Sequence, residues 1–452
     1  MNLEDHVIFK NSSIRESLSK IDLNKNGFLL VFDEDTKIIG LVTDGDIRRY
    51  LLKNDDLNQK IENCINRDFI YSDLNYTYEE IYKKLDSKIK VIPILDDSKK
   101  LVSIITKNNI PERQEHEFYA RSKSPVRISF GGGGSDTTEY FKDNLGAVIN
   151  STISIYSHAT LYKRKDSKIV IDSLDLDKKC EYNNISQFEK KDDDFKLFRA
   201  LMKIIKPKFG FDLIIQSDFP ISSGLGGSSV VLSAVIGCFN QFRNHKWTPY
   251  DMAEIAFEAE RLHLGISGGW QDQYATVFGG FNFIEFRKKE NLVFPIKLND
   301  QIISELEETL ILCYTKTKHD SNEIHESQKT NTTREKIKEI IKANVSLTYE
   351  MRNFLLKGEL DSLGEGLDKA WSYKKTFSDK ISNDYLDDIY KTAIENGASG
   401  GKLLGAGGGG YFLFFVPARK RNDFIKWSNL KGLIYTPFRF EDKGIQSWSI
   451  KM

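Results

Sequence analysis

The alternation of apolar and polar residues divides the chain into a short first part and a long second part. In the first part, residues 28–52 read as strand, turn, strand and helix, because two β-branched runs flank the turn residues DEDTK and DGD stands at a helix start. Residues 91–110 repeat the two strands around a second turn, DDSKK. The repeat period of roughly sixty residues is too long for a solenoid and predicts a duplicated small α/β domain.

The second part, residues 120–452, mixes strand-like and helical patterns. Segments 146–164 and 211–220 are rich in β-forming residues and precede a helical block. Residues 299–391 have the pattern of charged amphipathic helices, and 400–416 read as a glycine loop that leads into an apolar strand. We therefore predict an α/β protein with antiparallel features in this part.

Length and charge narrow the classes of function. A chain of 452 residues is too long for one ordinary core, so two or three domains are expected. The 65 Lys and Arg residues balance 65 Asp and Glu residues, which argues against a protein that binds nucleic acid or a membrane surface. A local cationic pocket for a phosphorylated small molecule remains compatible with this balance.

The start of the chain and the cysteines predict a cytoplasmic setting. The first residues lack the basic segment and following apolar stretch that indicate a signal peptide. No apolar run approaches the roughly 18 residues that span a bilayer. The four cysteines are far apart and form neither a disulfide framework nor metal-ligand pairs. A reducing compartment is the expectation that follows.

The first glycine cluster lies in the stretch SPVRISFGGGGSDTTEYF, 124–141. Alternating apolar residues suggest a strand that ends in four glycines, whose missing side chains let the backbone approach a ligand closely. Asp136 would then accept hydrogen bonds from ligand hydroxyls; the alternative is a turn in which Asp136 caps a helix that begins at Thr137. The candidate ligand-binding residues are Gly131, Gly132, Gly133, Gly134, Ser135 and Asp136.

The second cluster, PISSGLGGSS (220–229), runs into the apolar stretch 230–239. A helix N-terminus offers unpaired N–H groups and a partial charge of about +0.5, which suits a phosphate. The loop lacks the lysine of a Walker A motif, and a serine-capped helix without a ligand is the alternative. The candidate phosphate-binding residues are Ser222, Ser223, Gly224, Leu225, Gly226, Gly227, Ser228 and Ser229.

Two carboxylates and a third glycine cluster complete the candidate chemistry. Thr248 is a good helix N-cap, and Gly265 is expected to end that helix. Glu260 lies at the border of its apolar stripe, where it points inward or, alternatively, into solvent, and Asp272 follows twelve residues later. The third cluster, GAGGGG (405–410), could by itself be a tight entry to a strand.

Taken in order, these motifs resemble the signature of the GHMP kinases, and within that superfamily they are most similar to the heptose 7-phosphate kinases. The resemblance covers residues 120–452 and implies a two-domain α+β kinase fold, with an N-terminal domain over 120–300 and a C-terminal domain over 301–452. It further implies ATP and Mg²⁺, with residues 222–229 at the ATP phosphates. The acceptor would be the anomeric hydroxyl of a sugar phosphate.

The resemblance also implies roles for single residues. Asp272 is the candidate general base and Arg127 the cation beside it, while Ser228 and Glu260 are the candidate Mg²⁺ partners. The first cluster would orient the sugar, and Gly407 and Gly408 of the third would also contact it. Two alternatives stay open: a kinase for another sugar of the fucose or galactose type, and a nucleotide-sensing regulator with an inactive kinase fold.

The phrase IIGLVTDGDIRRYLL resembles a CBS motif, and residues 1–115 resemble a small α/β CBS pair. The resemblance implies that Thr43 and Asp46 contact the ribose and phosphate of an adenine nucleotide. The second half has Thr106 but Asn109 in place of the aspartate. The alternative is a module for oligomerisation or scaffolding, and because CBS pairs often associate, a homo-oligomer is an expectation.

Overall fold

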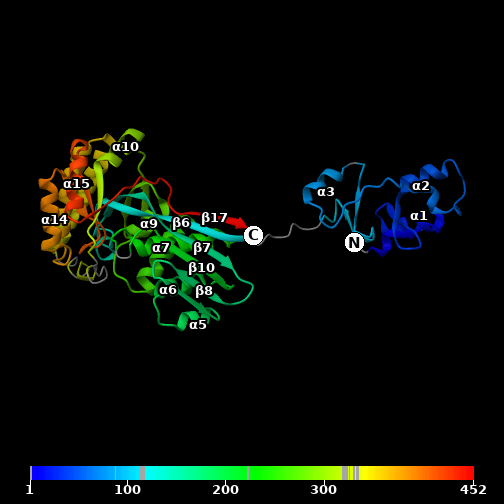
Figure 1. Cartoon of the computed structure of the whole chain (residues 1–452), viewed down its shortest axis with the longest axis horizontal. Helices are drawn as coiled ribbons and strands as arrows, with labels where there is room; N and C mark the ends of the chain where they lie inside the picture. The colour runs from blue at the N-terminus through cyan, green and yellow to red at the C-terminus, as the bar shows by residue number, and fades with distance from the viewer. Residues whose placement is uncertain are drawn as a thin grey trace. The chain divides into compact units, whose positions relative to one another are not determined.

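The computed structural model describes residues 3–86, 88–110, 118–220, 223–317, 324, 326–328, 331 and 335–452. The chain divides into two compact units, Met1–Glu115 and His116–Met452, each with its own core (Figure 1). The predicted boundary near residue 300, within the second unit, stays a prediction.

The first unit consists of two halves built around β-hairpins. β2 pairs antiparallel with β3 and parallel with β1, and β4 pairs antiparallel with β5. The predicted strand, turn, strand and helix over 28–52 and the second pair of strands over 91–110 are thus confirmed. Apolar side chains from both hairpins, including Leu30 and Ile104, share one cluster. The elements are β1 (Val7–Phe9), α1 (Ile14–Asn24), β2 (Phe28–Phe32), β3 (Ile38–Thr43), α2 (Asp44–Leu51), α3 (Tyr78–Lys84), β4 (Val91–Leu95) and β5 (Leu101–Thr106).

A large, mainly antiparallel sheet organises the second unit. Its order is β12-β11-β7-β10-β8-β9, and β6 joins it by pairing with β7 and with the C-terminal strand β17. The predicted strand before the first glycine cluster is confirmed as the end of β6, where the side chains on both faces of the strand are buried. The strands are β6 (Phe118–Gly131), β7 (Gly146–Lys163), β8 (Ile169–Ser173), β9 (Lys178–Tyr182), β10 (Phe211–Ser217), β11 (Phe281–Phe286), β12 (Asn291–Pro295) and β17 (Gln446–Lys451).

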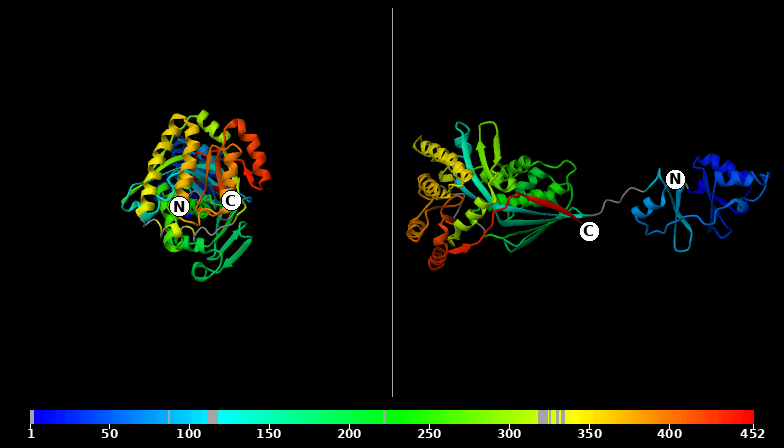
Figure 2. Two further views of the ribbon diagram at one scale, coloured as in Figure 1. Left: turned by 90° about the vertical axis from the view of Figure 1, so that its left-hand side faces the viewer. Right: turned by 90° about the horizontal axis from the view of Figure 1, so that it is seen from above.

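A second, four-stranded sheet has the order β14-β15-β13-β16 and packs with the later helices. Figure 2 shows the helices α12 to α14, in yellow and orange, gathered at one end of this unit. The elements are α10 (Asp300–Thr309), β13 (Leu310–Tyr314), α12 (Glu335–Lys357), α13 (Leu360–Lys375), α14 (Asp384–Glu395), β14 (Gly400–Leu403), β15 (Tyr411–Phe415), α15 (Arg421–Leu430) and β16 (Ile434–Thr436).

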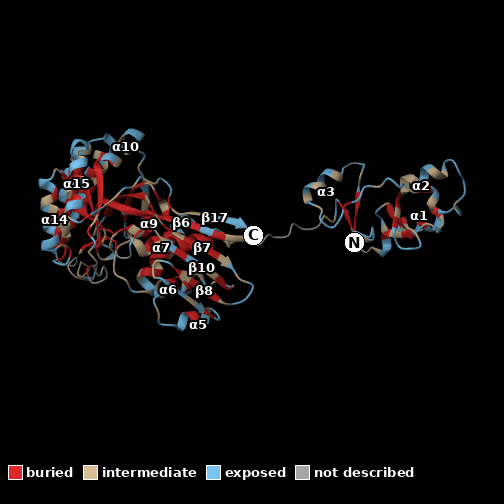
Figure 3. Ribbon diagram, in the orientation of Figure 1, coloured by how far each residue is buried: buried red, intermediate tan, exposed pale blue. Residues whose placement is uncertain are grey.

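The helices that carry the glycine loop and the carboxylates lie against the large sheet. α7 (Gly227–Gln241) is buried along most of its length and packs on β6 and β7 (Figure 3). Thr248 caps the next helix in a reciprocal capping box with Asp251, as predicted. The remaining helices are α4 (Thr138–Phe141), α5 (Ile185–Lys190), α6 (Lys196–Ile205), α8 (Pro249–Phe257) and α9 (Gln271–Phe278).

Two local features differ from the sequence-based expectation. Within 299–391, expected to be mostly helical, Leu310–Tyr314 forms the buried strand β13, because an apolar run of this length fits a central strand as well as a helix. The helix after Thr248 also changes character, since α8 ends at Phe257 and continues as a π-helical turn over Glu258–His263. The π turn carries Glu260, and such turns are frequent at functional sites.

Candidate active site

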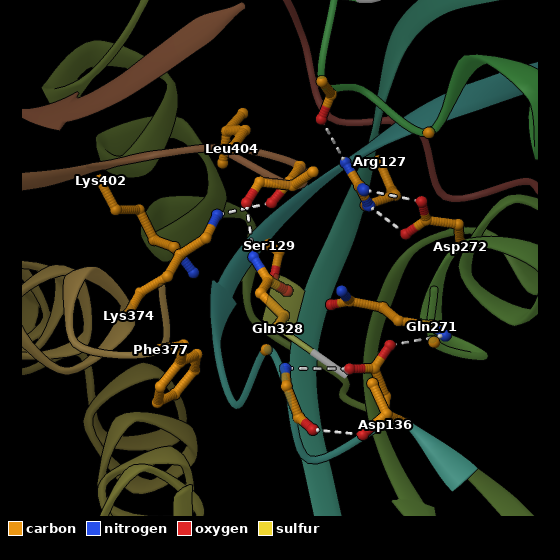
Figure 4. A pocket seen from close by; sticks show the side chains of 18 of the residues that line it. Arg127, Ser129, Asp136, Gln271, Asp272, Gln328, Lys374, Phe377, Lys402 and Leu404 are labelled. Carbon is orange, nitrogen blue, oxygen red and sulfur yellow. Dashed lines mark hydrogen bonds and ion pairs between the residues drawn. The ribbon is translucent and has the colours of Figure 1, made fainter. Parts of the chain in front are cut away.

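A cavity of about 710 Å³ in the second unit gathers residues from β6, the glycine loops, α7, α9, α13 and β14. This volume lies within the range of small-molecule sites. The cavity brings together predicted residues from three separate motifs (Figure 4). They are Arg127, Gly133, Gly134, Asp136, Ser223, Gly224, Gly226, Gly227, Ser228, Glu260 and Asp272.

Arg127 and Asp272 form a two-point ion pair in the cavity. Arg127 donates from Nε to Asp272 Oδ1 at 2.7 Å and from Nη2 to Oδ2 at 2.8 Å, a pairing that fixes the plane of the carboxylate (Figure 4). Its remaining Nη1 donates to the carbonyl of Gly224 at 2.9 Å. Arg127 is 3% exposed and Asp272 21%, so the pair is sheltered while the carboxylate remains accessible. One guanidinium therefore ties the candidate base to the glycine loop.

The glycine loop approaches Asp272 closely because Gly226 has no side chain. A Cβ on Gly226 would lie 3.0 Å from Asp272 Oδ2, and its backbone has the positive φ of 78° that glycine favours. Gly226 is also the N-cap of α7, so no side chain caps the first amides of the helix. The amides of the first turn, which includes Ser228, thus begin next to the candidate base and are suited to an anion.

Other residues of the predicted loop lie elsewhere. Ser229 is buried beside Glu260, and the Leu225 side chain is fully buried in the core, away from the cavity wall. Ser222 lies outside the described residues.

Glu260 is 2% exposed, so the alternative of a solvated glutamate is wrong. Ser228 donates a hydrogen bond to Oε1, while Ser229 and Gln273 donate to Oε2 at 2.8 and 2.7 Å. Four residues from three segments thereby form one buried polar network. This network fixes the Glu260 carboxylate directly under the first turn of α7.

The Ser228 hydroxyl and the Glu260 carboxylate are oxygen donors of the kind that Mg²⁺ prefers. No group of three or more His, Cys, Asp or Glu side chains suited to a metal ion occurs among the described residues. Two protein donors of this kind fit an ion that takes its other ligands from phosphate oxygens and water, as Mg²⁺ commonly does.

Asp136 organises the first glycine cluster and accepts from the first amide of α9, instead of capping the helix after Thr137. Its Oδ1 accepts from the Gly134 amide at 3.1 Å and its Oδ2 from the Gln271 amide at 3.2 Å, whereas α4 begins after Thr137 without a side-chain cap. A Cβ on Gly269 would lie 1.9 Å from Asp136 Oδ2, so glycine is required there. Burial raises the pKa of Asp136, and the nearby Asp272 carboxylate raises it further.

Some predicted sugar-binding residues lie outside the cavity wall. Gly131 and Gly132 pack against neighbouring elements, and the Ser135 hydroxyl donates to the carbonyls of Gly132 and Ala147. These contacts belong to the packing behind the wall and are explained by the tight approach of the loop to β7. Gly133, Gly134 and Asp136 are the members of this cluster that line the cavity.

The third glycine cluster supports the second. The Tyr411 amide donates to the Ser223 carbonyl at 3.2 Å, and Gly405 packs directly on Gly224. Gly407 and Gly408, predicted to contact the sugar, are not among the lining residues; they pack on Ile381, to whose carbonyl the Gly408 amide donates.

Sequence reasoning missed several polar residues of the cavity. Lys374 on α13 and Lys402 on β14 face it from the side opposite to Arg127 in Figure 4. A helical signal existed for Lys374, which continues the buried positions Leu367 and Ala370 with the spacing of one helix face. Lys402 stands inside a buried glycine-rich strand and gave no such signal. The other missed polar residues are Ser129, Thr137, Arg261, Gln271, Gln328 and Asn344.

In the first unit, the side chains of Thr43 and Asp46 are engaged with each other. Thr43 Oγ1 accepts from the Asp46 amide at 3.2 Å, and Asp46 Oδ2 accepts from the Thr43 amide and hydroxyl, which closes a capping box at the start of α2. Thr106 and Asn109 repeat the hydroxyl contact at 2.7 Å. The threonine–aspartate phrase thus has a structural role in helix capping by itself.

Comparison with protein families matches three segments. Residues 195–280 match the GHMP kinases N terminal domain, residues 351–426 the GHMP kinases C terminal domain, and residues 1–53 the CBS domain. The CBS match covers the first half of the first unit. Among the described residues, no helix has the length and hydropathy to cross a membrane.

Three relatives match about three quarters of this chain and nearly the whole of their own length. The chain is 39% identical over 336 residues to D-glycero-alpha-D-manno-heptose 7-phosphate kinase of Campylobacter jejuni, covering 73% of this chain and 99% of the relative. A putative sugar kinase from Campylobacter jejuni, of known structure, has 34% identity and a TM-score of 0.58 over 75% of this chain and 100% of its own. The structure of a D-glycero-D-manno-heptose 1-phosphate kinase from Bacteroides thetaiotaomicron gives 26% identity and a TM-score of 0.61, over 74% and 100%.

Proposed function

The chain belongs to the GHMP kinase family, and we propose that this ATP-dependent sugar kinase phosphorylates D-glycero-D-manno-heptose 7-phosphate at the anomeric hydroxyl. The product would be the 1,7-bisphosphate, a precursor of nucleotide-activated heptose. The substrate follows from the relative that is 39% identical along 99% of its length. The observation that carries the chemistry is the Arg127–Asp272 pair, which adjoins the glycine loop and the start of α7 in one cavity.

Phosphoryl transfer requires positioning and charge stabilisation more than covalent chemistry. The amides at the start of α7 would bind the phosphates of ATP, and Asp272 would take the proton from the attacking sugar hydroxyl. Arg127 orients the Asp272 carboxylate through two hydrogen bonds and supplies a positive charge beside the transferred group. Gly133, Gly134 and Asp136 would line the sugar.

Ser228 and Glu260 would hold Mg²⁺, because their oxygens lie together at the first turn of α7. When bound, the ion neutralises charge on the transferred phosphoryl group. Ser229 and Gln273 keep the second oxygen of Glu260 engaged and so leave Oε1 toward Ser228.

The substrate is tested by incubating the full chain with ATP, Mg²⁺ and a panel of sugars. The panel contains heptose 7-phosphate, the unphosphorylated heptose, fucose and galactose. We expect the highest kcat/KM with heptose 7-phosphate, and phosphorus NMR should show a new phosphate coupled to the anomeric proton. A preference for fucose or galactose would replace the proposed substrate. No turnover of any sugar would support the alternative of a regulator with an inactive kinase fold.

For the first unit, we infer an adenine nucleotide as the ligand near Thr43 and Asp46, on the strength of the CBS match over residues 1–53. Titration calorimetry of the full chain with AMP would test it, with the kinase cavity first saturated by a non-hydrolysable ATP analogue. Absence of heat under these conditions favours the scaffold or oligomer role for the unit.

A further inference from the structure

Lys374 and Lys402 place two ammonium groups on the wall of the cavity opposite Arg127 and Asp272. Lys402 is 4% exposed, and Lys374 is half-buried. Their ammonium groups contact carbonyl oxygens: Lys374 Nζ donates to Leu403 O at 3.0 Å and to Gly405 O at 2.5 Å, and Lys402 Nζ donates to Phe130 O at 3.3 Å. Among the described residues, neither lysine forms an ion pair with a carboxylate.

The charged residues of the cavity show an excess of positive charge on this side. Four cationic side chains line it against three carboxylates. Arg127 is paired with Asp272, and Arg261 Nη1 lies 3.6 Å from Glu260 Oε1. The charge of Asp136 raises the pKa of both lysines, and that of Asp272 also raises the pKa of Lys374. The oxygens of Asp136 already accept two backbone amides. The lining cations are Arg127, Arg261, Lys374 and Lys402, and the carboxylates are Asp136, Glu260 and Asp272.

An ammonium that is buried or half-buried without a counter-ion is costly, and since no carboxylate among the described residues pairs with either lysine, this wall suits an anionic ligand. An ammonium has three N–H donors, and among the described residues the Lys402 group uses one of them, in a long hydrogen bond. The unused donors suit a ligand with several acceptor oxygens. A phosphate monoester dianion has that chemistry.

We propose that Lys374 and Lys402 form a subsite for the phosphate that the acceptor sugar already carries. The inference rests on the proposed function, because it requires the substrate to be a sugar phosphate. The lysines lie across the cavity from Asp272 in Figure 4, so a sugar held between the walls presents its hydroxyl to the base and its own phosphate to the lysines. These lysines would select sugar phosphates against neutral sugars.

The test compares Lys402→Met and Lys374→Met with wild type on heptose 7-phosphate and on the same heptose without phosphate. Each methionine retains the length of the stem and removes the charge. We expect KM for the sugar phosphate to rise about 10- to 100-fold, the usual effect of losing a hydrogen bond to a charged group. KM for ATP should stay the same, and kcat/KM for the neutral heptose should fall much less than kcat/KM for the sugar phosphate.

Lys375→Met is the matched control. Lys375 is next to Lys374 on α13 but pairs with Asp387 outside the cavity, at 3.2 Å. It should leave all constants unchanged. An equal loss with both sugars, or a rise in KM for ATP, would overturn the subsite and assign the lysines to the transferred phosphate instead.

Failure of the subsite and failure of the proposed function give different results. If wild type converts another sugar phosphate in preference to both its neutral form and heptose 7-phosphate, the substrate is wrong while the subsite stands. If wild type converts heptose 7-phosphate and the methionine variants bind it normally, the function stands and the subsite is wrong. Conversion of neutral sugars alone would refute both.

A measurement on wild type does not depend on how the variants fold. Burial, with the charges of Lys402 and Arg127, lowers the pKa of Lys374 well below its usual value, while Asp272 and Asp136 act in the opposite direction. Burial, with the nearby charge of Arg127, lowers the pKa of Lys402 to about 7, while Asp136 acts in the opposite direction. Above that pH the ammonium loses its proton, so KM for heptose 7-phosphate should rise by up to about tenfold per pH unit. KM for the neutral heptose should not follow. Parallel pH profiles for the two sugars would contradict the subsite.

Discussion

The charged groups on the two walls of the kinase cavity have different kinds of hydrogen-bond partner. On one wall Arg127 binds Asp272 through two short hydrogen bonds, and Glu260 accepts from two serines and a glutamine. On the other, Lys374 and Lys402 meet backbone carbonyls. We call the wall with Arg127, Asp272 and Glu260 the satisfied wall and the wall with the two lysines the unsatisfied wall or lysine wall. The satisfied wall is preorganised for a reaction, since its groups are fixed before substrate arrives. The unsatisfied wall is completed by the charge of a ligand.

The largest expected effect comes from the satisfied wall. Asp272→Asn keeps the size of the side chain and one acceptor for Arg127 but removes the proton acceptor. We expect kcat to fall by about 100-fold or more, as for the loss of a general base, while ATP binding persists. Steady-state kinetics and calorimetry with a non-hydrolysable ATP analogue measure the two quantities.

Asp300→Asn is the control for this change, because Asp300 is an exposed aspartate in the first turn of α10 and is not among the residues of the cavity. Unchanged turnover in Asp272→Asn would remove Asp272 from the mechanism. The catalytic base would then have to be sought on the lysine wall, which would reverse the comparison between the two walls.

A smaller effect is expected at the carboxylate under α7. Glu260→Gln retains the shape but replaces one oxygen with a donor that cannot accept from Ser228 or bind a cation. The Mg²⁺ concentration for half-maximal activity should rise by about tenfold, the lower range for weakened metal sites. Glu258→Gln is the matched control, because Glu258 lies on the same π turn, is 45% exposed and faces His263. An identical Mg²⁺ titration for wild type and Glu260→Gln would exclude the metal role.

The sequence anticipated the satisfied wall well, for physical reasons. The alternation around Val126 and Phe130 predicted the strand that delivers Arg127, and the cap at Thr248 predicted the helix that leads to Glu260. Glycines, caps and strand alternation are local requirements of the backbone, so they leave a trace in the residues themselves. The pairing of Arg127 with Asp272 needed the whole ordered set of motifs.

The lysine wall was missed because its chemistry depends on packing between distant segments. The helical spacing places Lys374 on the buried face of its helix, but it does not show that this face borders a cavity until α13 is placed against β14. Lys402 is buried by the fold around it and not by any local pattern. The strand β13 was missed for a similar reason, since a five-residue apolar run is decided by its neighbours.

The smallest predicted effect distinguishes a wall built for binding from one built for stability. The pKa of Lys402 falls from 10.5 to about 7 on folding, so between these values the unfolded chain holds a proton that the folded chain lacks. Stability of the ligand-free protein should therefore rise with pH across this window, and below pH 7 the full cost of the buried charge is present. Lys402→Met removes that cost and should raise Tm by a few degrees at pH 6, with a smaller gain at pH 9.

Differential scanning calorimetry of wild type, Lys402→Met and the Lys375→Met control measures this gain without reference to activity. Saturating heptose 7-phosphate should then raise Tm more in wild type than in Lys402→Met, because the ligand compensates a charge that only wild type carries. A variant that melts below wild type at pH 6 would mean that Lys402 stabilises the fold through its carbonyl contact. In that case the two walls would differ in their partners but not in their purpose.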